Sequence, residues 1–303
     1  MNIQEVSIDR VYVSGCRGSS PTNTHKVCIN LAGGYRNGME FILTGIDIEE
    51  KAQIITDALF NSVGGKEQFD EVSILLDRTD KKDPNSNEEA MASLRISVKS
   101  KDPDLVGRMF TAKMIELALA NYPGFFTGGG VRSGGPVLVY WPALIDSKHI
   151  KETVHIDGKK IDVMPTNQLD LEETYYQKQP IEIPPPPSGE TINKPLGMLF
   201  GARSGDKGGC ANIGVWAKNE NAFSFLNNFL TVEKIKELMP DIREFEIDRY
   251  ELPNILSLNF YIHDILEDGV SSNTRKDGQA KSLGEYLRAK YADIPKSLFE
   301  ENI

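Results

Sequence analysis

The chain has 303 residues, a formal net charge of −10 and a hydrophobic fraction of 40%. This length predicts two domains of ordinary size, and the acidic balance argues against a nucleic-acid groove, which needs a basic surface. No apolar run approaches the roughly 18 residues that a membrane-spanning helix needs, and the N-terminus shows no secretory signal. The 3 cysteines and 4 histidines stand at no metal-ligand spacing. They indicate a reduced, cytoplasmic protein without a disulfide framework or a metal site.

The first half of the chain alternates strand and helix patterns. β-Branched residues in alternating patterns predict strands at 9–14, 26–31, 39–44, 71–76 and 92–98. The glycine-rich segment 33–38 predicts a turn between two of these strands. Helices are predicted from Asp47, which can cap residues 48–62, and from Asp102 or Asp104 up to the turn at 121–124. In the second of these helices we expect Met109 and Met114 to face inward.

A proline-rich segment divides the chain. Four consecutive prolines at 184–187 can neither continue a helix nor pair in a central strand, which predicts an extended spacer. We therefore expect a first domain at 1–165, a linker at 166–194 and a second domain at 195–303. Within the second domain the patterns predict strands at 196–200, 211–217, 244–250 and 257–263, and helices at 221–229, 231–238 and 281–291. Strands and helices in this order indicate the α+β class in both domains.

The segment 201–216, GARSGDKGGCANIGVW, concentrates glycine and charge in an expected loop. Its glycines let the backbone approach a ligand closely, and successive free N–H groups in such a loop can bind an anion. The candidate substrate-binding residues of this segment are Arg203, Ser204, Gly205, Lys207, Gly208, Gly209 and Asn212, and Asp206 is a candidate catalytic base. The spacing is neither that of a P-loop nor that of a dinucleotide-binding fingerprint, because a strand follows. A glycine-rich connection between strands with charges on its surface is the alternative.

Four other segments hold candidate site residues. The segment 125–141 repeats the Arg-Ser-Gly pattern at Arg132 and Ser133, which favours a site shared with the segment 201–216. Arg17 and Arg36, both in glycine-containing segments, are further candidate substrate-binding residues. His263 closes an apolar strand and is a candidate catalytic acid or base. Surface loops, and a histidine with a structural role, are the alternative interpretations.

Several motifs resemble a known family. ARSGDKGGCANIGVWA, DRYELPN and LNFYIHDIL resemble the C-terminal ferredoxin-fold domain of the acyclic terpene utilisation (AtuA-like) proteins. VSGCRG, LAGGYRNGMEFILTGIDIEEKA, ELALANYPGFF and VYWPAL resemble the later part of the large domain in the same family. The resemblance covers nearly the whole chain and implies that the second domain is a ferredoxin-like α/β sandwich. Family members are usually about twice this length and begin with a glycine-rich domain that this chain lacks. A natural split subunit, a truncation and a reduced homologue are the alternatives, and we favour a split subunit whose missing domain a second polypeptide supplies.

The resemblance also implies a function. It suggests a component of a catabolic enzyme that acts on a small organic acid or acyl-CoA thioester in a lyase- or hydratase-like reaction. Arg203 and Lys207 would bind the carboxylate or the CoA phosphates, the backbone N–H groups of Gly205 to Gly209 would stabilise an oxyanion, and Asp206 or His263 would move a proton. The cofactor is left open, and CoA as part of the substrate is one candidate. The expected partners are this substrate and other subunits of an oligomer, with no nucleic acid and no membrane. The alternative is a non-catalytic assembly subunit of a larger hetero-oligomeric complex.

Overall fold

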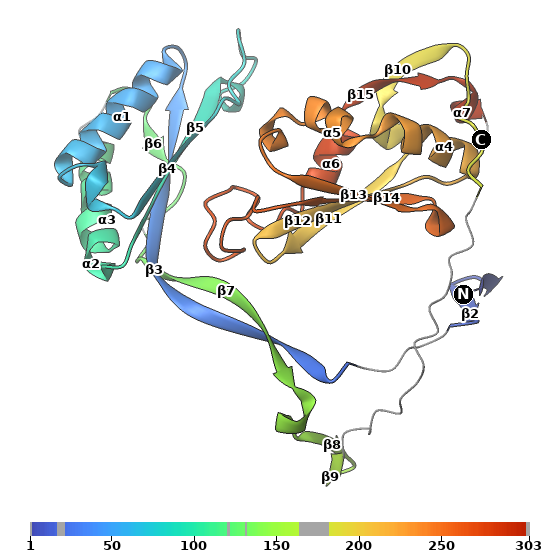
Figure 1. Cartoon of the computed structure of the whole chain (residues 1–303). Coiled ribbons are helices and arrows are strands. Elements are labelled where there is room, and N and C mark those ends of the chain that lie inside the picture. Colours follow the sequence, from blue (N-terminus) through green and yellow to red (C-terminus); the bar gives the residue numbers. More distant parts are fainter. Residues whose placement is uncertain (1, 17–21, 120–121, 131, 164–181, 301–303) are drawn as a thin grey trace. The chain divides into compact units, whose positions relative to one another are not determined.

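Figure 1 shows the computed structural model, which describes residues 2–16, 22–119, 122–130, 132–163 and 182–300. The chain forms two compact units, one of residues 1–29 and 141–180 and the other of residues 30–140 and 181–303. Both large hydrophobic cores of the described residues lie in the second unit. No helix in the described ranges is both long and apolar enough to cross a membrane.

The first unit contains two hairpins. β1 (Asn2–Ser7) pairs with β2 (Arg10–Ser14), and β8 (Glu152–Ile156) pairs with β9 (Lys159–Val163), both antiparallel. The predicted strand at 9–14 is thereby confirmed. Nearly all side chains of these four strands are exposed. A two-stranded sheet without a covered face is marginally stable in water, so these hairpins gain little from their own packing.

A five-stranded sheet lies mostly within residues 30–140 of the second unit, and two of its strands extend beyond this range. Its strands are β3 (Thr24–Thr44), β4 (Glu71–Asp77), β5 (Met91–Ser100), β6 (Phe126–Thr127) and β7 (Gly135–Asp146). The order is β4-β5-β3-β6, and β7 also pairs with β3. Its helices are α1 (Ile48–Ser62), α2 (Pro103–Val106) and α3 (Arg108–Leu119), with single turns η1 (Lys66–Gln68) and η2 (Glu88–Ala90).

Alternation along β3 and β5 gives this sheet one apolar and one polar face. The buried residues are Met39, Phe41, Leu43, Ala92, Leu94, Ile96 and Val98. They form one core with buried side chains of the helices, including Ile55 and Leu59 of α1 and Phe110 and Met114 of α3. Because alternate side chains of a strand point to opposite faces, the residues between them lie on the face away from this core.

The predicted turn at 33–38 is wrong, because β3 continues through it from Thr24 to Thr44. Gly34 has a φ of 101°, and a Cβ atom there would lie 2.7 Å from the carbonyl oxygen of Ser100. The glycine therefore allows the backbones of β3 and β5 to approach each other. A cluster of glycines has the same composition in a turn and in such a strand, and only the pairing partner distinguishes them.

The predicted helices of this region are confirmed with changes at their ends. α1 occupies the predicted residues, but Asp47 has a left-handed backbone and makes no side-chain capping bond. Asp102 caps α2 by accepting a hydrogen bond from the N–H of Asp104, and Gly107 separates α2 from α3. Met114 is buried as expected, whereas Met109 is 62% exposed, because two residues five positions apart in one helix lie about 140° apart around its axis.

Residues 181–303 form a second sheet with four antiparallel strands in the order β11-β12-β14-β13. These strands are β11 (Gly201–Lys207), β12 (Cys210–Trp216), β13 (Ile247–Leu252) and β14 (Ser257–Ile262). A separate pair joins β10 (Thr191–Pro195) to β15 (Tyr291–Pro295). The helices are α4 (Glu220–Phe229), α5 (Val232–Leu238), α6 (Leu283–Arg288) and α7 (Ser297–Glu300), with turns η4 (Leu196–Met198), η5 (Pro240–Ile242) and η6 (Pro253–Ile255).

One face of this sheet carries the second core. Ile213 and Val215 of β12, and Leu258 and Phe260 of β14, are buried with apolar residues of α4, α5 and α6. Figure 1 shows these helices on one side of the sheet. The α+β class predicted for the chain is therefore confirmed.

The helices and strands predicted for residues 195–303 agree with the structure in part. The helices at 221–229 and 231–238 and the strands at 244–250 and 257–263 are confirmed within a few residues. The expected strand at 196–200 contains η4 instead, and the helix predicted at 281–291 is shorter because β15 follows it. Residues 191–194 of β10 lie inside the predicted linker, and residues 166–181 of that linker lie outside the described residues.

Candidate functional site

A cavity of about 470 Å³ lies on the polar face of the five-stranded sheet. Its floor consists of side chains that share one face of β3 and β5, namely Arg36, Gly38, Glu40, Arg95, Ser97 and Lys99. A Cβ atom at Gly38 would lie 2.8 Å from the carbonyl oxygen of Ile96 and 2.7 Å from the Ser97 hydroxyl. The glycine therefore keeps the middle of the floor open.

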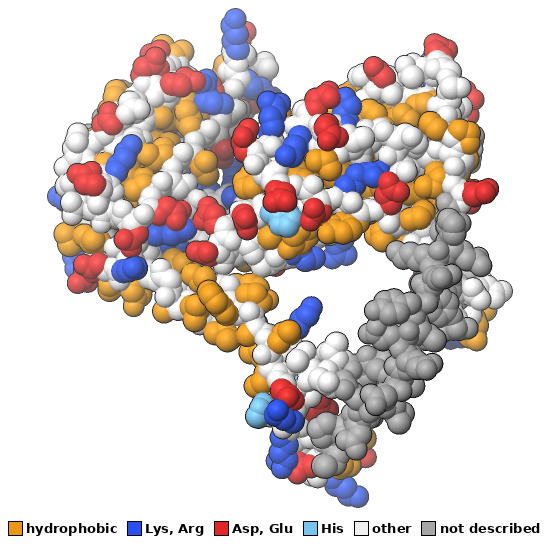
Figure 2. Space-filling view, viewed as in Figure 1, with side chains coloured by type: hydrophobic (Ala, Val, Ile, Leu, Met, Phe, Trp, Pro, Cys, Tyr) orange, Lys and Arg blue, Asp and Glu red, His pale blue; other side chains and the backbone are white. Residues whose placement is uncertain are grey.

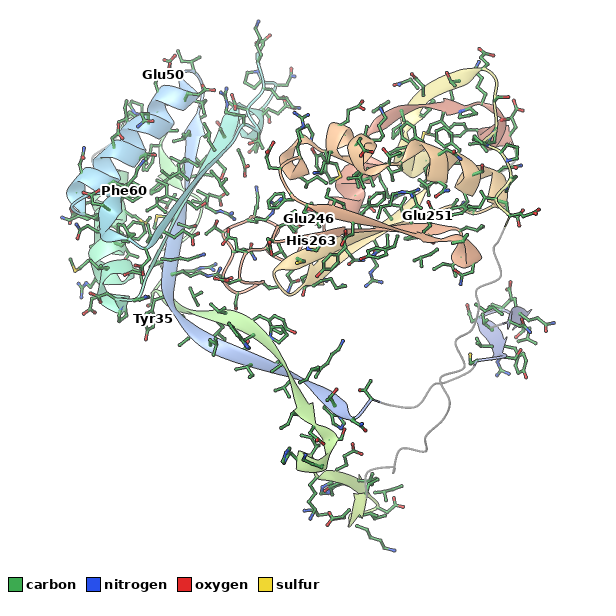
Figure 3. All side chains as sticks on the ribbon, viewed as in Figure 1. Tyr35, Glu50, Phe60, Glu246, Glu251 and His263 are labelled. Atoms are coloured by element: carbon green, nitrogen blue, oxygen red, sulfur yellow. The ribbon has the colours of Figure 1, made fainter. Side chains whose placement is uncertain are left out.

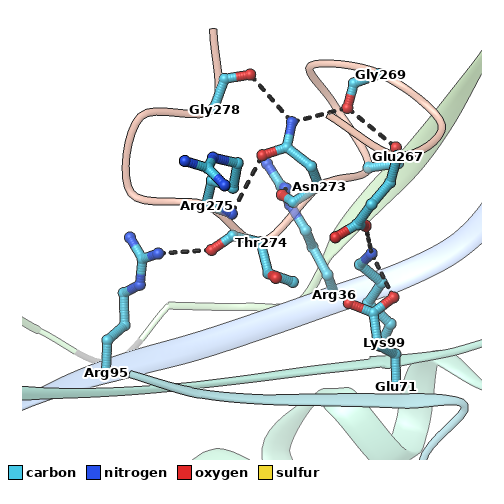
Figure 4. A network of polar contacts seen from close by, with 11 residues as sticks. Arg36, Glu71, Arg95, Lys99, Glu267, Gly269, Asn273, Thr274, Arg275 and Gly278 are labelled. Atoms are coloured by element: carbon cyan, nitrogen blue, oxygen red, sulfur yellow. Dashed lines mark hydrogen bonds and ion pairs between the residues drawn. The ribbon is translucent and has the colours of Figure 1, made fainter. Parts of the chain in front are cut away.

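Two loops supply the rest of the lining. Arg132 and Ser133 precede β7, and residues 273–275 belong to the segment between β14 and α6. Figure 4 shows how this segment meets the sheet. Arg36 donates from Nη1 to the carbonyl oxygen of Asn273 at 3.1 Å, and Arg95 donates from Nη2 to that of Thr274 at 2.6 Å.

Asn273 fixes the shape of this loop. Its side chain is buried, and Nδ2 donates to the carbonyl oxygens of Gly269 at 2.9 Å and Gly278 at 3.0 Å (Figure 4). Its Oδ1 accepts a hydrogen bond from the N–H of Arg275 at 3.1 Å. A buried amide with satisfied donors and acceptor holds a loop in one arrangement. The carbonyl groups that bind the two arginines are therefore well positioned.

The cavity is strongly basic. Five basic side chains and one carboxylate line it: Arg36, Arg95, Lys99, Arg132 and Arg275 against Glu40. Glu71 at 2.6 Å and Glu267 at 3.4 Å balance the charge of Lys99, and Asp241 lies 3.5 Å from Arg275. Within the described ranges, no carboxylate forms an ion pair with Arg36, Arg95 or Arg132. Guanidinium groups that have no carboxylate partner are suited to bind carboxylate or phosphate oxygens of a ligand.

Glu40 is the carboxylate of the lining. It accepts a hydrogen bond from the Ser93 hydroxyl, which lies on the same face of β5. Its register partner on β5 is Arg95. The cavity thus brings a group that can accept a proton close to groups that can hold an anion, which is the combination that general acid–base chemistry on an acidic substrate requires.

The segment 201–216 is a hairpin and not the expected loop. β11 pairs with β12 from Gly201 to Lys207, so its backbone forms a ladder in place of a run of free N–H groups. Gly208 and Gly209 make the turn. A Cβ atom at Gly209 would lie 2.1 Å from the carbonyl oxygen of Glu267, so this glycine permits close packing of the 264–269 segment.

The strand divides the candidate residues of β11 between two faces. Ser204 is opposite Ile213 and Asp206 is opposite Ala211, so both share the face of the core. The Ser204 hydroxyl accepts a hydrogen bond from the N–H of Gly284 at 2.9 Å, and Asp206 lies 3.5 Å from Lys281. The other face of the sheet carries Arg203, Gly205, Lys207 and Asn212. Asp206 therefore does not share a face with the two basic residues beside it.

A second cavity, of about 320 Å³, is lined in part by the same hairpin. Asp206 and Gly208 line it together with Tyr140 and Leu138 of β7.

Three of the candidate residues proposed from the sequence line the basic cavity, namely Arg36, Arg132 and Ser133. Arg17 lies outside the described residues. Arg95, Lys99 and Arg275 could not be recognised as site residues from the sequence, because their approach depends on strand register and on the course of a long loop.

His263 forms a dyad with Asp248. Its Nε2 lies 2.9 Å from Oδ2 of Asp248, and the imidazole is 32% exposed. The hydrogen bond to Asp248 is the main cause that raises the pKa of His263 above its ordinary value of 6.5, and the charges of Glu246 and Asp264 add to it. The contact with Asp248 therefore favours the protonated imidazole. It is not part of the lining of either cavity.

We expect an NMR titration of His263 to give a pKa above 6.5, and Asp248→Asn to lower it. A raised pKa in the folded state stabilises the protein below the pKa of the unfolded chain, and this stabilisation is lost as the pH rises through the folded value. Proton shifts of the imidazole measure the effect directly. An unchanged pKa in the Asp248→Asn variant would show that the dyad does not control this proton.

Comparison with known families covers most of the residues just described. A family model described as acyclic terpene utilisation family protein AtuA matches residues 1–156. A second model, described as the AtuA ferredoxin-like domain, matches residues 195–292. No curated protein and no solved structure matches the chain. All residues that line the basic cavity lie inside the two matched ranges.

Proposed function

Because the chain belongs to the acyclic terpene utilisation AtuA family, we propose that it is a component of a catabolic enzyme that binds a small organic acid or its acyl-CoA thioester. The basic cavity is the observation that carries this proposal. Its volume falls within the range of small-molecule sites, and three arginines without a carboxylate partner among the described residues line it.

The side chains that line the cavity have different roles in this proposal. Arg36, Arg95 and Arg132 bind the carboxylate of the acid or the phosphates of CoA, while Ser133 and the backbone beside Gly38 border the remainder of the ligand. In the lyase- or hydratase-like step, Glu40 moves the proton, because it is the only carboxylate among the described residues of this lining. Asp206 and His263 lie outside the lining, so their catalytic use requires a second site.

A thermal-shift series tests the proposal. The chain is heated with CoA, with branched-chain acyl-CoA esters and with the matching free acids. A ligand that binds only the folded state stabilises it by about 2.7 kcal/mol at one hundred times its dissociation constant. We expect a rise in melting temperature with acyl-CoA that shrinks as salt increases, since the contacts are ionic. Unchanged melting temperatures with millimolar amounts of every ligand would refute the proposal.

A non-catalytic assembly subunit is the second candidate. It is favoured by the exposed apolar side chains of the first unit, including Ile3 and Val11 of the β1–β2 hairpin and Val154 and Ile161 of the β8–β9 hairpin. Exposed apolar surface of this kind marks contact with another chain, such as the second polypeptide expected from the family. Analytical ultracentrifugation of the chain with and without acyl-CoA distinguishes the candidates, because assembly alone requires no ligand.

A further inference from the structure

Glu246, Asp248 and His263 lie together at one end of the four-stranded sheet. Asp248 belongs to β13, Glu246 immediately precedes that strand, and His263 immediately follows β14. The N–H of His263 donates to the carbonyl oxygen of Glu246 at 3.0 Å, which continues the ladder between the two strands. Figure 3 shows Glu246 and His263 beside each other.

The register places the three side chains on one face. Glu246 and Asp248 are two residues apart on one strand, and His263 stands opposite Glu246. The residues between them, Ile247 and Ile262, are buried in the core on the other face. The three side chains therefore project from a hydrogen-bonded backbone on the side away from the core. Figure 2 shows a histidine bordered by acidic side chains at the surface in this region.

The donor atoms are close enough to share one ion. One ligand atom from each residue lies within 4.8 Å of the other two, and His263 Nε2 is 2.9 Å from Asp248 Oδ2. Zinc binds nitrogen and oxygen ligands at about 2.1 Å, so two ligand atoms at a tetrahedral angle are about 3.4 Å apart. The separation of 2.9 Å between His263 and Asp248 is shorter than this spacing, and the limit of 4.8 Å for the three ligand atoms is longer.

We propose that Glu246, Asp248 and His263 bind a divalent transition-metal ion. One imidazole and two carboxylates suit zinc and other ions of intermediate hardness, and three protein ligands leave a position for water or substrate. The two carboxylates balance the charge of the ion. The ring of Tyr261 stands edge-on to the imidazole at 4.9 Å between centroids and restricts its orientation. This proposal does not depend on the acyl-CoA proposal, because the three ligands lie outside the lining of the basic cavity.

The ion must compete with the proton held by His263. The groups that face the imidazole are Asp248, Glu246, Asp264 and Tyr261. The carboxylates among them stabilise the imidazolium as well as a bound cation. A metal can use Nε2 only after the proton leaves, so zinc affinity should fall as the pH is lowered through the pKa of His263.

The test uses the chain after treatment with a chelator. Calorimetric titration with Zn²⁺, and the visible absorption of Co²⁺, should show one strong site per chain with a dissociation constant in the micromolar range or tighter. His263→Ala and Asp248→Asn should each weaken binding at least tenfold. His155→Ala is the matched control, because this imidazole is exposed on β8, and it should leave the affinity unchanged.

A second measurement does not depend on any variant. Addition of Zn²⁺ to the unmodified chain should shift the imidazole NMR signals of His263 and leave those of His149 and His155 in place. Unchanged signals of His263, or equal zinc affinity of the unmodified chain and folded His263→Ala and Asp248→Asn variants, would overturn the proposal. Circular dichroism establishes that each variant is folded.

Discussion

Replacing Arg132 by alanine is expected to weaken the binding of an acyl-CoA or its free acid by about ten- to a hundredfold. The guanidinium of Arg132 lines the basic cavity, and no described carboxylate pairs with it. Its hydrogen bonds to an anionic ligand are therefore lost without a compensating rearrangement inside the protein. Hydrogen bonds of this charged kind contribute about 1.5–3 kcal/mol each. Isothermal titration calorimetry of the variant beside the unmodified chain measures the loss.

Arg203→Ala is the matched control for this experiment. Arg203 is also an exposed arginine, but β11 places it outside the lining of the basic cavity. Its removal should leave the affinity close to that of the unmodified chain. The opposite pattern, with binding lost in Arg203→Ala and retained in Arg132→Ala, would move the anion site to the hairpin at 201–216.

Replacing Phe260 by alanine is expected to lower the free energy of unfolding of the 181–303 region by about 3–5 kcal/mol. The ring is fully buried on β14, between β12 and β13, and contributes to the core beneath α4, α5 and α6. Its removal takes away buried apolar area and leaves a cavity that a sheet can close only in part. Urea denaturation followed by the fluorescence of Trp216 on the adjacent β12 gives the value.

Tyr250→Ala provides the comparison within the same sheet. Tyr250 lies on β13, is 51% exposed and is opposite Asn259, not a core residue. Its removal should change the free energy of unfolding by less than about 1 kcal/mol. A loss for Phe260→Ala that is no larger than the loss for Tyr250→Ala would show that the core is centred elsewhere.

Local patterns were sufficient to predict some of the helices and strands, including α1, α4, α5, β5 and β14. The pattern at 48–62 predicted α1, and the pattern at 231–238 predicted α5, which Thr231 caps by accepting a hydrogen bond from the N–H of Lys234. Both signals act within a few residues along the chain. The glycine-rich segments 33–38 and 201–209 were wrongly predicted as a turn and a loop. The glycines are needed there because the backbone of a segment far away in sequence lies close to them.

The candidate site could be predicted only in part for the same reason. Arg36, Arg132 and Ser133 stand in glycine-rich segments and were recognised by composition. Arg95 and Lys99 occur in an ordinary amphipathic strand, and only the register of β5 against β3 brings them to the cavity. The cluster of Glu246, Asp248 and His263 likewise exists only through strand pairing, because its histidine has no metal-ligand neighbour at a recognisable spacing along the chain.

The most direct test of the basic cavity is a crystal structure of the chain grown with a branched-chain acyl-CoA. We predict that carboxylate, thioester or phosphate oxygens of the ligand lie within hydrogen-bond distance of Arg36, Arg95 and Arg132, with Glu40 facing the reacting carbon atoms. A ligand bound instead on the sheet face at Arg203 and Lys207, with no ligand atom in the basic cavity, would contradict this account.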